Sequence, residues 1–174
     1  MIRKLGRLTV VAAAVLLLAG CGENTAKLDP PDIKYGEDIS EMGMFVVDPR
    51  YTVAALPQEG DWILFDDIGE LFKYHNRFPG TRFRATWVND YHTQQWTHAE
   101  DAWYVQSPGL KTPMGWGVAA FADEAEAHAF QTGQGGTMMT WDEAQARAWD
   151  TPPAPHDEVH TATPEATPST HDHG

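Results

Sequence analysis

Three methionines are the residues of this chain whose type and spacing point most directly to chemistry. Met42 and Met44 lie two residues apart at the start of a β-branched run, and on a β-strand that spacing places both sulfurs on one face. Met114 lies in the short loop Lys111–Gly117, between a proline and a glycine. Thioether sulfur is a soft, neutral donor that selects Cu(I) over Zn(II) or Mg(II). Methionine also fills gaps in hydrophobic cores, so each of the three, taken alone, fits a packing role as well.

Histidines form a second group of candidate ligands, and four of the eight lie close to the C-terminus, at positions 156, 160, 171 and 173. His171 and His173 flank an aspartate, and their imidazoles suit Cu(II), Ni(II) or Zn(II). A flexible histidine-rich tail typically binds metal loosely, without a defined site. A solvated spacer with no metal function is the alternative interpretation of the same residues.

The sequence contains no pattern typical of an enzyme. Asp66 and Asp67 are adjacent carboxylates, but a helix N-cap explains one of them more simply than acid–base catalysis does. Ser107 and His98 lack the elbow motif and the acid of a hydrolase triad. The glycine-rich stretch 133–136 follows a predicted helix, where glycine ends a helix and does not cradle a phosphate. We therefore predict a protein without a catalytic role.

The N-terminus is typical of a bacterial lipoprotein signal peptide. A basic start is followed by the apolar run Leu8–Leu18, which is too short to span a membrane, and then by Leu-Ala-Gly before Cys21. We predict that residues 1–20 are removed and that Cys21 carries a diacylglycerol anchor, which makes the protein extracytoplasmic and membrane-anchored. An ordinary signal peptide followed by a coincidental cysteine is the alternative. Lipidation of this single cysteine would exclude intrachain disulfides and cysteine-based zinc sites. Gly22, in place of an acidic retention residue, favours the outer membrane.

Charge and composition divide the remainder of the chain. Without residues 1–20 it keeps nine basic and 25 acidic residues, a net charge of −16, which argues against nucleic acid and against electrostatic binding to anionic lipid. Residues 21–38 are polar and contain two prolines, so we expect a linker between the lipid and the domain. Residues 151–174 are rich in Pro, Thr and His with almost no apolar side chains, so we expect a disordered tail.

The body between these ends, residues 39–150, has an internal repeat of strand, strand, helix, strand. We predict an α+β fold of two ββαβ modules, about 39–91 and 96–145, packed around a cleft. The helix starts are also similar, because 65–70 and 121–126 each place a short acidic cap before a Glu in the first turn. The expected strands are 44–48, 52–56, 62–65, 84–89, 102–106, 117–121 and 136–140, and the expected helices are 67–75 and 123–132.

Several stretches together resemble the NosL family, the copper-binding accessory lipoproteins of nitrous oxide reductase assembly. The strongest is the Thr-Pro-Met-Gly-Trp-Gly loop at 112–117, which follows the Phe-Asp-Asp-Ile-Gly helix start at 65–69. The others are Met42-Gly43-Met44, Asp48–Tyr51, Trp87–Tyr91, Trp96, Ala102–Val105, Ala120-Phe121, Gly135-Gly136 and Trp141.

The resemblance implies two ββαβ modules and one Cu(I) bound in the cleft. The family takes its ligands from a Cys-Gly-Met element, whose methionine corresponds to Met44, and from a loop methionine, which corresponds to Met114. This chain has Met42 where the family usually has cysteine. We hypothesise that Met42 replaces that cysteine and gives a site of three neutral sulfurs, still selective for Cu(I). His92 is an additional candidate donor.

The resemblance also implies a function: an extracytoplasmic, lipid-anchored Cu(I) chaperone for the copper–sulfide centre of nitrous oxide reductase. Its expected partners are the reductase or its assembly machinery, and the membrane through Cys21. Two alternatives follow from the sequence. One is a copper buffer or resistance lipoprotein that relies on the histidine-rich tail. The other is a partner-binding scaffold whose metal site has degenerated, since the family cysteine is missing.

Overall fold

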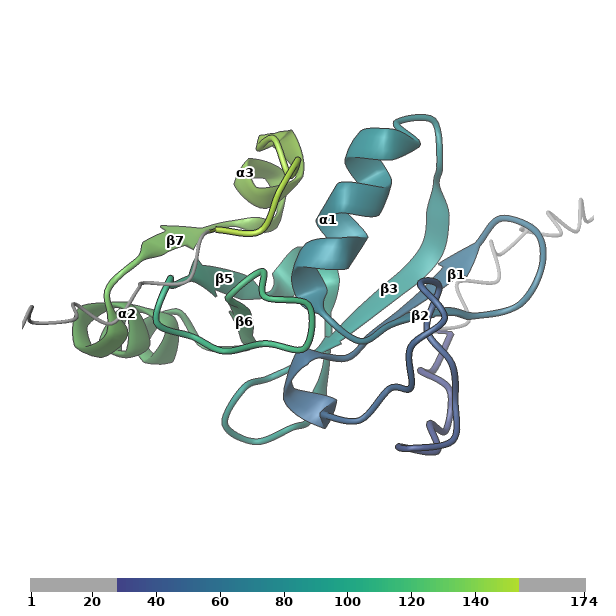
Figure 1. The fold of residues 1–174 in the computed structure, drawn as a ribbon, viewed down its shortest axis with the longest axis horizontal. Helices are drawn as coiled ribbons and strands as arrows, with labels where there is room; N and C mark the ends of the chain where they lie inside the picture. Colours follow the sequence, from purple (N-terminus) through teal and green to yellow (C-terminus); the bar gives the residue numbers. More distant parts are fainter. Residues whose placement is uncertain (1–27, 154–174) are drawn as a thin grey trace, which may run out of the picture.

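The computed structural model describes residues 28–153, which form two small antiparallel sheets with helices packed on them (Figure 1). The first sheet has the strand order β2-β1-β3-β4, and the second has the order β6-β5-β7. In each module the first strand is central, the second pairs on one side, and the strand after the helix pairs on the other. The predicted repeat of ββαβ modules is therefore confirmed. The elements of the first sheet are β1 (Val53–Pro57), β2 (Ile63–Phe65), α1 (Ile68–Arg77), β3 (Phe83–Asn89) and β4 (Trp96–His98).

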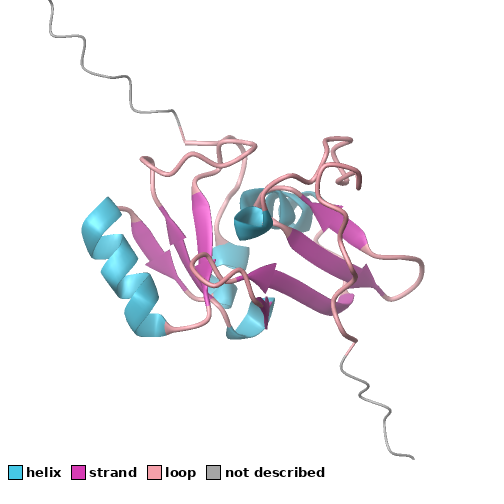
Figure 2. Ribbon diagram, turned by 90° about the horizontal axis from the view of Figure 1, so that it is seen from below, coloured by secondary structure: helices cyan, strands magenta, loops and turns pink. Residues whose placement is uncertain are grey.

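The second module repeats this order and ends in an additional helix. Figure 2 shows the two sheets side by side, with one helix on the outer side of the second sheet. This helix, α2, buries only Ala127, and it packs against all three strands of its own sheet. The elements are β5 (Trp103–Gln106), β6 (Val118–Phe121), α2 (Glu124–Gln134), β7 (Thr137–Met139) and α3 (Trp141–Ala146), with short 3-10 helices η1 (Pro49–Tyr51) and η2 (Ala99–Asp101).

Helix α1 occupies the centre of the domain and joins the two modules. It contacts β2 of its own sheet and also β6 and α3 of the second module. Its apolar face is fully buried, and the Phe72 ring lies edge-on to Tyr104 at 5.2 Å and stacks with Trp149 at 5.1 Å. Burial of large aromatic side chains contributes most of the stability of a small core. The core of this domain is therefore shared between the modules.

The segment before β1 is part of the domain. Residues 28–38 were expected to belong to a linker, but Ile33 is buried and the indole N–H of Trp87 donates to the Leu28 carbonyl at 2.8 Å. Residues 28–38 therefore belong to the domain, and Trp87 of β3 connects them to the first sheet. None of the helices between residues 28 and 153 is long and apolar enough to cross a bilayer.

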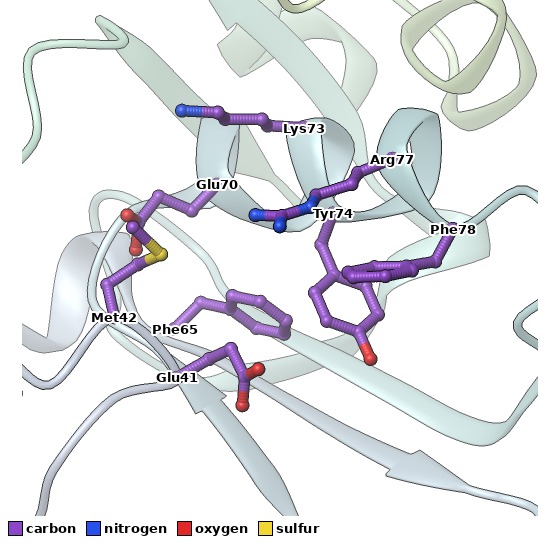
Figure 3. Close-up of a pocket in the computed structure, with 8 residues that line it drawn as sticks. All are labelled: Glu41, Met42, Phe65, Glu70, Lys73, Tyr74, Arg77 and Phe78. Atoms are coloured by element: carbon purple, nitrogen blue, oxygen red, sulfur yellow. The ribbon is translucent and has the colours of Figure 1, made fainter.

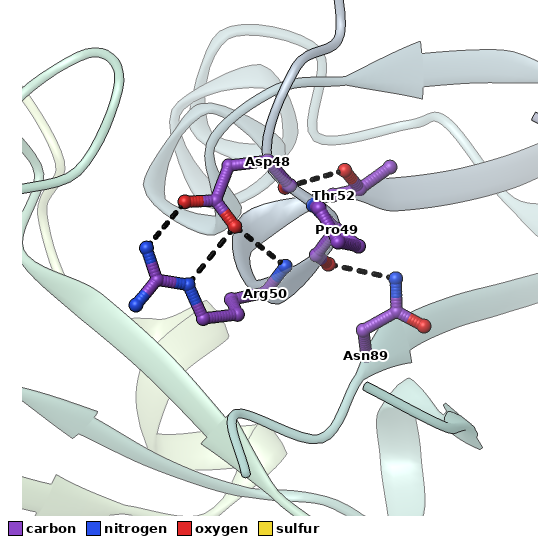
Figure 4. Close-up of polar contacts among 5 residues, drawn as sticks. All are labelled: Asp48, Pro49, Arg50, Thr52 and Asn89. Carbon is purple, nitrogen blue, oxygen red and sulfur yellow. Dashed lines mark hydrogen bonds and ion pairs between the residues drawn. The ribbon is translucent and has the colours of Figure 1, made fainter. Parts of the chain in front are cut away.

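The predicted strand 44–48 is wrong. Only one isolated bridge, between Ile39 and Phe45, forms here, and the chain then turns into η1. Asp48 makes this turn by accepting hydrogen bonds from the Arg50 backbone and guanidinium, while Asn89 Nδ2 donates to the Pro49 carbonyl at 2.7 Å (Figure 4). The guanidinium holds the pKa of Asp48 below its usual value. The Asp-Pro-Arg sequence thus favours a local turn over strand pairing.

Two elements of the second half were not predicted. Strand β4 pairs with the end of β3, and helix α3 follows β7 directly. The start of α3 carries a complete capping box: Thr140 accepts from the Glu143 backbone N–H, and the Glu143 carboxylate accepts from the Thr140 N–H at 2.8 Å. This Thr-x-x-Glu pattern is a sequence signal for the start of a helix.

Candidate metal centre

Met42 and Met44 lie on a tight turn at the surface of the first module. Ser40 N–H donates to the Met44 carbonyl at 2.8 Å, and Gly43 takes a positive φ of 79° at the tip of the turn, a conformation that favours glycine. The turn is fixed to the sheet because Glu41 N–H donates to the Leu64 carbonyl at 2.8 Å. The expectation that the two methionines share one strand face is therefore wrong. Their side chains are 53% and 51% exposed.

A pocket of about 230 Å³ lies between this turn and α1 (Figure 3). Met42 lines it, whereas Met44 is not among the lining residues. Its wall is aromatic, with the Phe65 and Tyr74 rings edge-on at 5.5 Å. Charged side chains of α1 complete the wall. The full lining is Glu41, Met42, Phe65, Glu70, Lys73, Tyr74, Arg77 and Phe78.

The loop that carries Met114 is fixed to the first turn of α1 by Asp67. One carboxylate oxygen of Asp67 caps the helix through Gly69 N–H at 3.0 Å. The other accepts from the Thr112 hydroxyl, from Met114 N–H at 3.0 Å and from Trp116 N–H at 3.5 Å. Asp67 is fully buried, and Met114 is partly buried against the main core. The predicted helix cap is confirmed, and it also positions the predicted loop ligand.

Met42 and Met114 therefore belong to two elements that both lie against α1. Glu70, one turn after Asp67, lines the Met42 pocket, while Asp67 itself holds the Met114 backbone. Lys73 lies near both the Met42 pocket and the Met114 loop. It lines the pocket, and its ammonium lies 5.5 Å from the ring centroid of Trp116 in the loop. Met114 itself is not among the residues that line the Met42 pocket.

Three acidic side chains at the start of α1 are buried, and the pKa values of two of them are raised. Asp66, Asp67 and Glu70 are 2%, 0% and 4% exposed. Burial raises the pKa of Asp67 above its usual value, although the hydrogen bonds that it accepts act in the opposite direction. Burial, together with the Asp66 and Asp67 carboxylates, raises the pKa of Glu70 to about 8, and Lys73 partly opposes the shift. Sequence reasoning treated Glu70 only as a first-turn residue favourable to the helix dipole, and the local pattern contains no signal that it would be buried.

Of the other predicted metal ligands, His92 lies among the described residues, and it does not line this pocket. His92 is exposed in the turn after β3, with its ring 5.5 Å from that of Phe121, on the side of the second module. Cys21, His171 and His173 lie outside the described residues. Within residues 28–153, no cluster of three or more His, Cys, Asp or Glu side chains could hold a metal ion by itself. A metal at this pocket would therefore depend on thioether sulfur.

A second pocket lies where the two modules face each other. It has a volume of about 480 Å³, with His75 of α1 and Phe83 of β3 on one side and Trp141 of α3 on the other. None of the three candidate methionines lines it. The Met42 pocket instead lies inside the first module, between α1 and the turn 40–44.

The element order and the two sheets define a small α+β domain built from a duplicated ββαβ unit. The NosL family model matches residues 32–149, and the chain belongs to the NosL family. The structure is also similar to the crystal structure of the copper chaperone NosL from Shewanella denitrificans, with a TM-score of 0.58 and 19% sequence identity. That likeness covers 68% of this chain and 98% of the other, and at this identity it shows a shared fold. No curated protein has a significant sequence match to this chain.

Proposed function

We propose that this protein is an extracytoplasmic, lipid-anchored Cu(I) chaperone that supplies copper for the copper–sulfide centre of nitrous oxide reductase. The observation that carries the proposal is the convergence of the Met42 pocket and the Met114 loop on the first turns of α1. Membership of the NosL family supports it, and the structural relative from Shewanella denitrificans is itself described as a copper chaperone.

The chemistry of the donors suits delivery as well as binding. Thioethers are soft and neutral, so they favour Cu(I) over hard cations and do not hold it as strongly as thiolates. Met42 and Met44 are about half exposed, which leaves their sulfurs accessible to ligands of a recipient protein. In this proposal the turn 40–44 presents the metal, and the Asp67-bound loop brings Met114 to it.

The lipid anchor and the recipient are further parts of the proposal. Acylation of Cys21 would tether the domain to the membrane through the segment that precedes Ile33. The recipient would be nitrous oxide reductase or its assembly machinery on the same side of the membrane. The acidic surface of the mature chain fits a partner with a basic docking face.

A Cu(I) titration of the mature chain from Cys21, against a competing chelator, tests this function. We expect one tight equivalent in the natural protein and a loss of more than about 100-fold in affinity when Met42, Met44 and Met114 are all changed to leucine, which preserves size. Met138→Leu is the matched control, because Met138 lies in β7 and packs in the second module. The loaded protein should then transfer copper to copper-free reductase in the presence of its assembly machinery.

The two alternative functions give different results in the same titration. A chain without residues 151–174 should keep the tight equivalent if the protein is a chaperone, whereas a buffer that relies on the histidine-rich tail should lose most of its capacity. Absence of tight Cu(I) binding in the natural chain would contradict the chaperone proposal and favour a scaffold with a degenerate site.

A further inference from the structure

The exposed apolar side chains of the domain gather in one segment near its start. Seven large apolar residues between positions 28 and 153 are exposed, and six of them lie within residues 35–47. A contiguous group of such side chains marks an interaction surface, whereas single ones are common on any protein. The six are Tyr35, Ile39, Met42, Met44, Phe45 and Val47, and the seventh is Phe78.

Three of these side chains point to the same side of the segment. Ile39 and Phe45 form an antiparallel bridge, and residues that bridge directly place their side chains on one face. Val47 follows Phe45 by two residues, and Val46 between them is fully buried, so the chain alternates between inside and outside here. Ile39, Phe45 and Val47 are 50%, 55% and 58% exposed. We call these three residues the apolar face.

The apolar face lies near the point where the chain would be tethered. Only seven residues separate Cys21 from Leu28, and even a fully extended chain spans no more than about 25 Å over that length. The start of the domain is joined to the apolar face, because Gly36 N–H donates to the Val46 carbonyl at 2.8 Å. Figure 1 shows the segment before β1, in purple and dark blue, lying together below β2. A lipid on Cys21 would therefore keep this segment close to the bilayer.

We propose that the apolar face contacts the lipid bilayer that carries the Cys21 anchor and thereby fixes the orientation of the domain on the membrane. The inference rests on the acylation of Cys21 in the proposed function and is independent of the metal. A tether alone limits the distance of a domain from the membrane but leaves it free to rotate. Apolar side chains that enter the boundary between headgroups and acyl chains leave water, and their burial favours one orientation.

The charges near the apolar face select the kind of lipid surface. Glu37 and Glu41 are exposed on the same segment, and the guanidinium of Arg50 is paired with Asp48. Anionic headgroups attract basic segments and repel carboxylates, whereas zwitterionic headgroups carry no net charge. The contact therefore depends on apolar burial and favours zwitterionic lipid, unlike the basic amphipathic helices that bind anionic membranes.

This contact does not use the candidate metal ligands. Met42 lines the pocket beside α1, and the Met114 loop is fixed to α1 through Asp67. Neither methionine belongs to the apolar face. A domain that is oriented by the bilayer would meet a recipient on the same membrane with these elements in a constant direction.

The test measures how closely a label approaches the lipid in the full acylated chain. The chain has no cysteine besides Cys21, whose sulfur is blocked by acylation, so Glu37→Cys or Glu126→Cys provides one site for a fluorophore. Both glutamates are exposed, and Glu126 lies on α2 in the second module. In phosphatidylcholine vesicles that contain brominated lipid, we expect the label at residue 37 to be quenched at least about three-fold more strongly than the label at residue 126.

Substitution of the apolar face separates bilayer contact from simple proximity to the tether. We expect Ile39→Ser, Phe45→Ser and Val47→Ser, combined in one chain, to reduce the quenching at residue 37 by about three-fold or more, although the tether is unchanged. Phe78→Ser is the matched control, because Phe78 is an exposed aromatic residue outside the apolar face, and it should leave the quenching unchanged. Circular dichroism would verify that the variants are folded.

Equal quenching of the two labels, or unchanged quenching in the triple variant, would overturn the bilayer contact and leave the chaperone proposal standing. Energy transfer between copies labelled at residue 37, lost in the triple variant, would also overturn it and would assign the apolar face to a second copy of the chain. Mass spectrometry of Cys21 precedes these measurements. An unmodified Cys21 would refute both the lipid anchor and this inference, while the Cu(I) titration would still test the metal site.

Discussion

The two modules begin their helices in the same way, yet only the beginning of α1 borders the candidate site. Asp67 and Asp123 both cap a helix, in α1 and α2, as their similar sequences predict. Asp123 is exposed, and its carboxylate accepts from Glu126 N–H, at 3.0 Å. Asp67 is fully buried and also accepts from the Met114 loop. The same local motif has thus become a link between modules in one copy and remained a simple cap in the other.

The next residues of the two helices continue this divergence. Gly69 lies against Trp116, so closely that a Cβ at this position would be 2.2 Å from the Trp116 Cβ. Its counterpart Ala125 is exposed. Glu70 is buried beside the Met42 pocket, whereas Glu126 faces solvent. Tertiary packing of α1 between the modules, and not its local sequence, makes its first turn the candidate site.

The largest difference between the modules should come from removing the two caps. Asp67→Ala leaves the Gly69, Thr112 and Met114 donors without their acceptor in a buried setting, so we expect a loss of about 4 kcal/mol in the free energy of unfolding. Asp123→Ala should cost only about 1 kcal/mol, the usual value of an exposed N-cap. Urea denaturation of both variants measures the difference. Equal losses would mean that the Met114 loop gains nothing from its attachment to Asp67.

A smaller difference in stability, of the same sign, is expected at the second residue of each helix, Gly69 in α1 and Ala125 in α2. Gly69→Ala places a methyl group against the buried Trp116, and we expect a cost of about 3 kcal/mol even though alanine favours helices. The reciprocal change Ala125→Gly removes only helix propensity and should cost about 1 kcal/mol. Thermal and urea unfolding would measure both. A neutral Gly69→Ala would show that the TPMGWG loop shifts easily, and Cu(I) affinity in that variant would then report whether its position matters.

The ββαβ repeat could be predicted from the sequence because it depends on local signals. Acidic caps, first-turn glutamates and short apolar runs occur in the same order twice, and these are determined by neighbours along the chain. The predicted strand 44–48 was wrong because other local signals, which favour turns, outweigh its apolar pattern. Gly43 and the Asp48–Arg50 turn impose a local conformation that alternating apolar residues could not override.

The site was less predictable because its main features are non-local. Met42 and Met114 were chosen for their chemistry, and nothing in the sequence alone shows that both elements attach to α1. Glu70 was predicted only to favour the helix dipole, because its burial depends on residues far away in the sequence, such as Glu41 and Met42, which line the same pocket. An acidic residue next to two others in a predicted cap is a weak signal, and exposed clusters with this pattern are common on helices.

The last difference between the modules concerns the charge of Glu70 in the metal-free protein and has the opposite sign. Burial beside Asp66 raises the pKa of Glu70 to about 8, so the carboxyl binds its proton more tightly in the folded state than in the unfolded one. This contribution to stability is fully present below the unfolded pKa of about 4.5 and is lost as the pH rises towards 8. With chelator present, Glu70→Gln should therefore gain several kcal/mol of stability relative to the natural protein between pH 4 and pH 8.5.

Urea unfolding over this pH range, with Glu126→Gln measured in parallel, makes the comparison between the modules quantitative. Glu126 is exposed, so its substitution should change the stability by less than about 0.5 kcal/mol at every pH. A pH-independent difference for Glu70→Gln would mean that the folded chain pairs the Glu70 charge in the absence of metal.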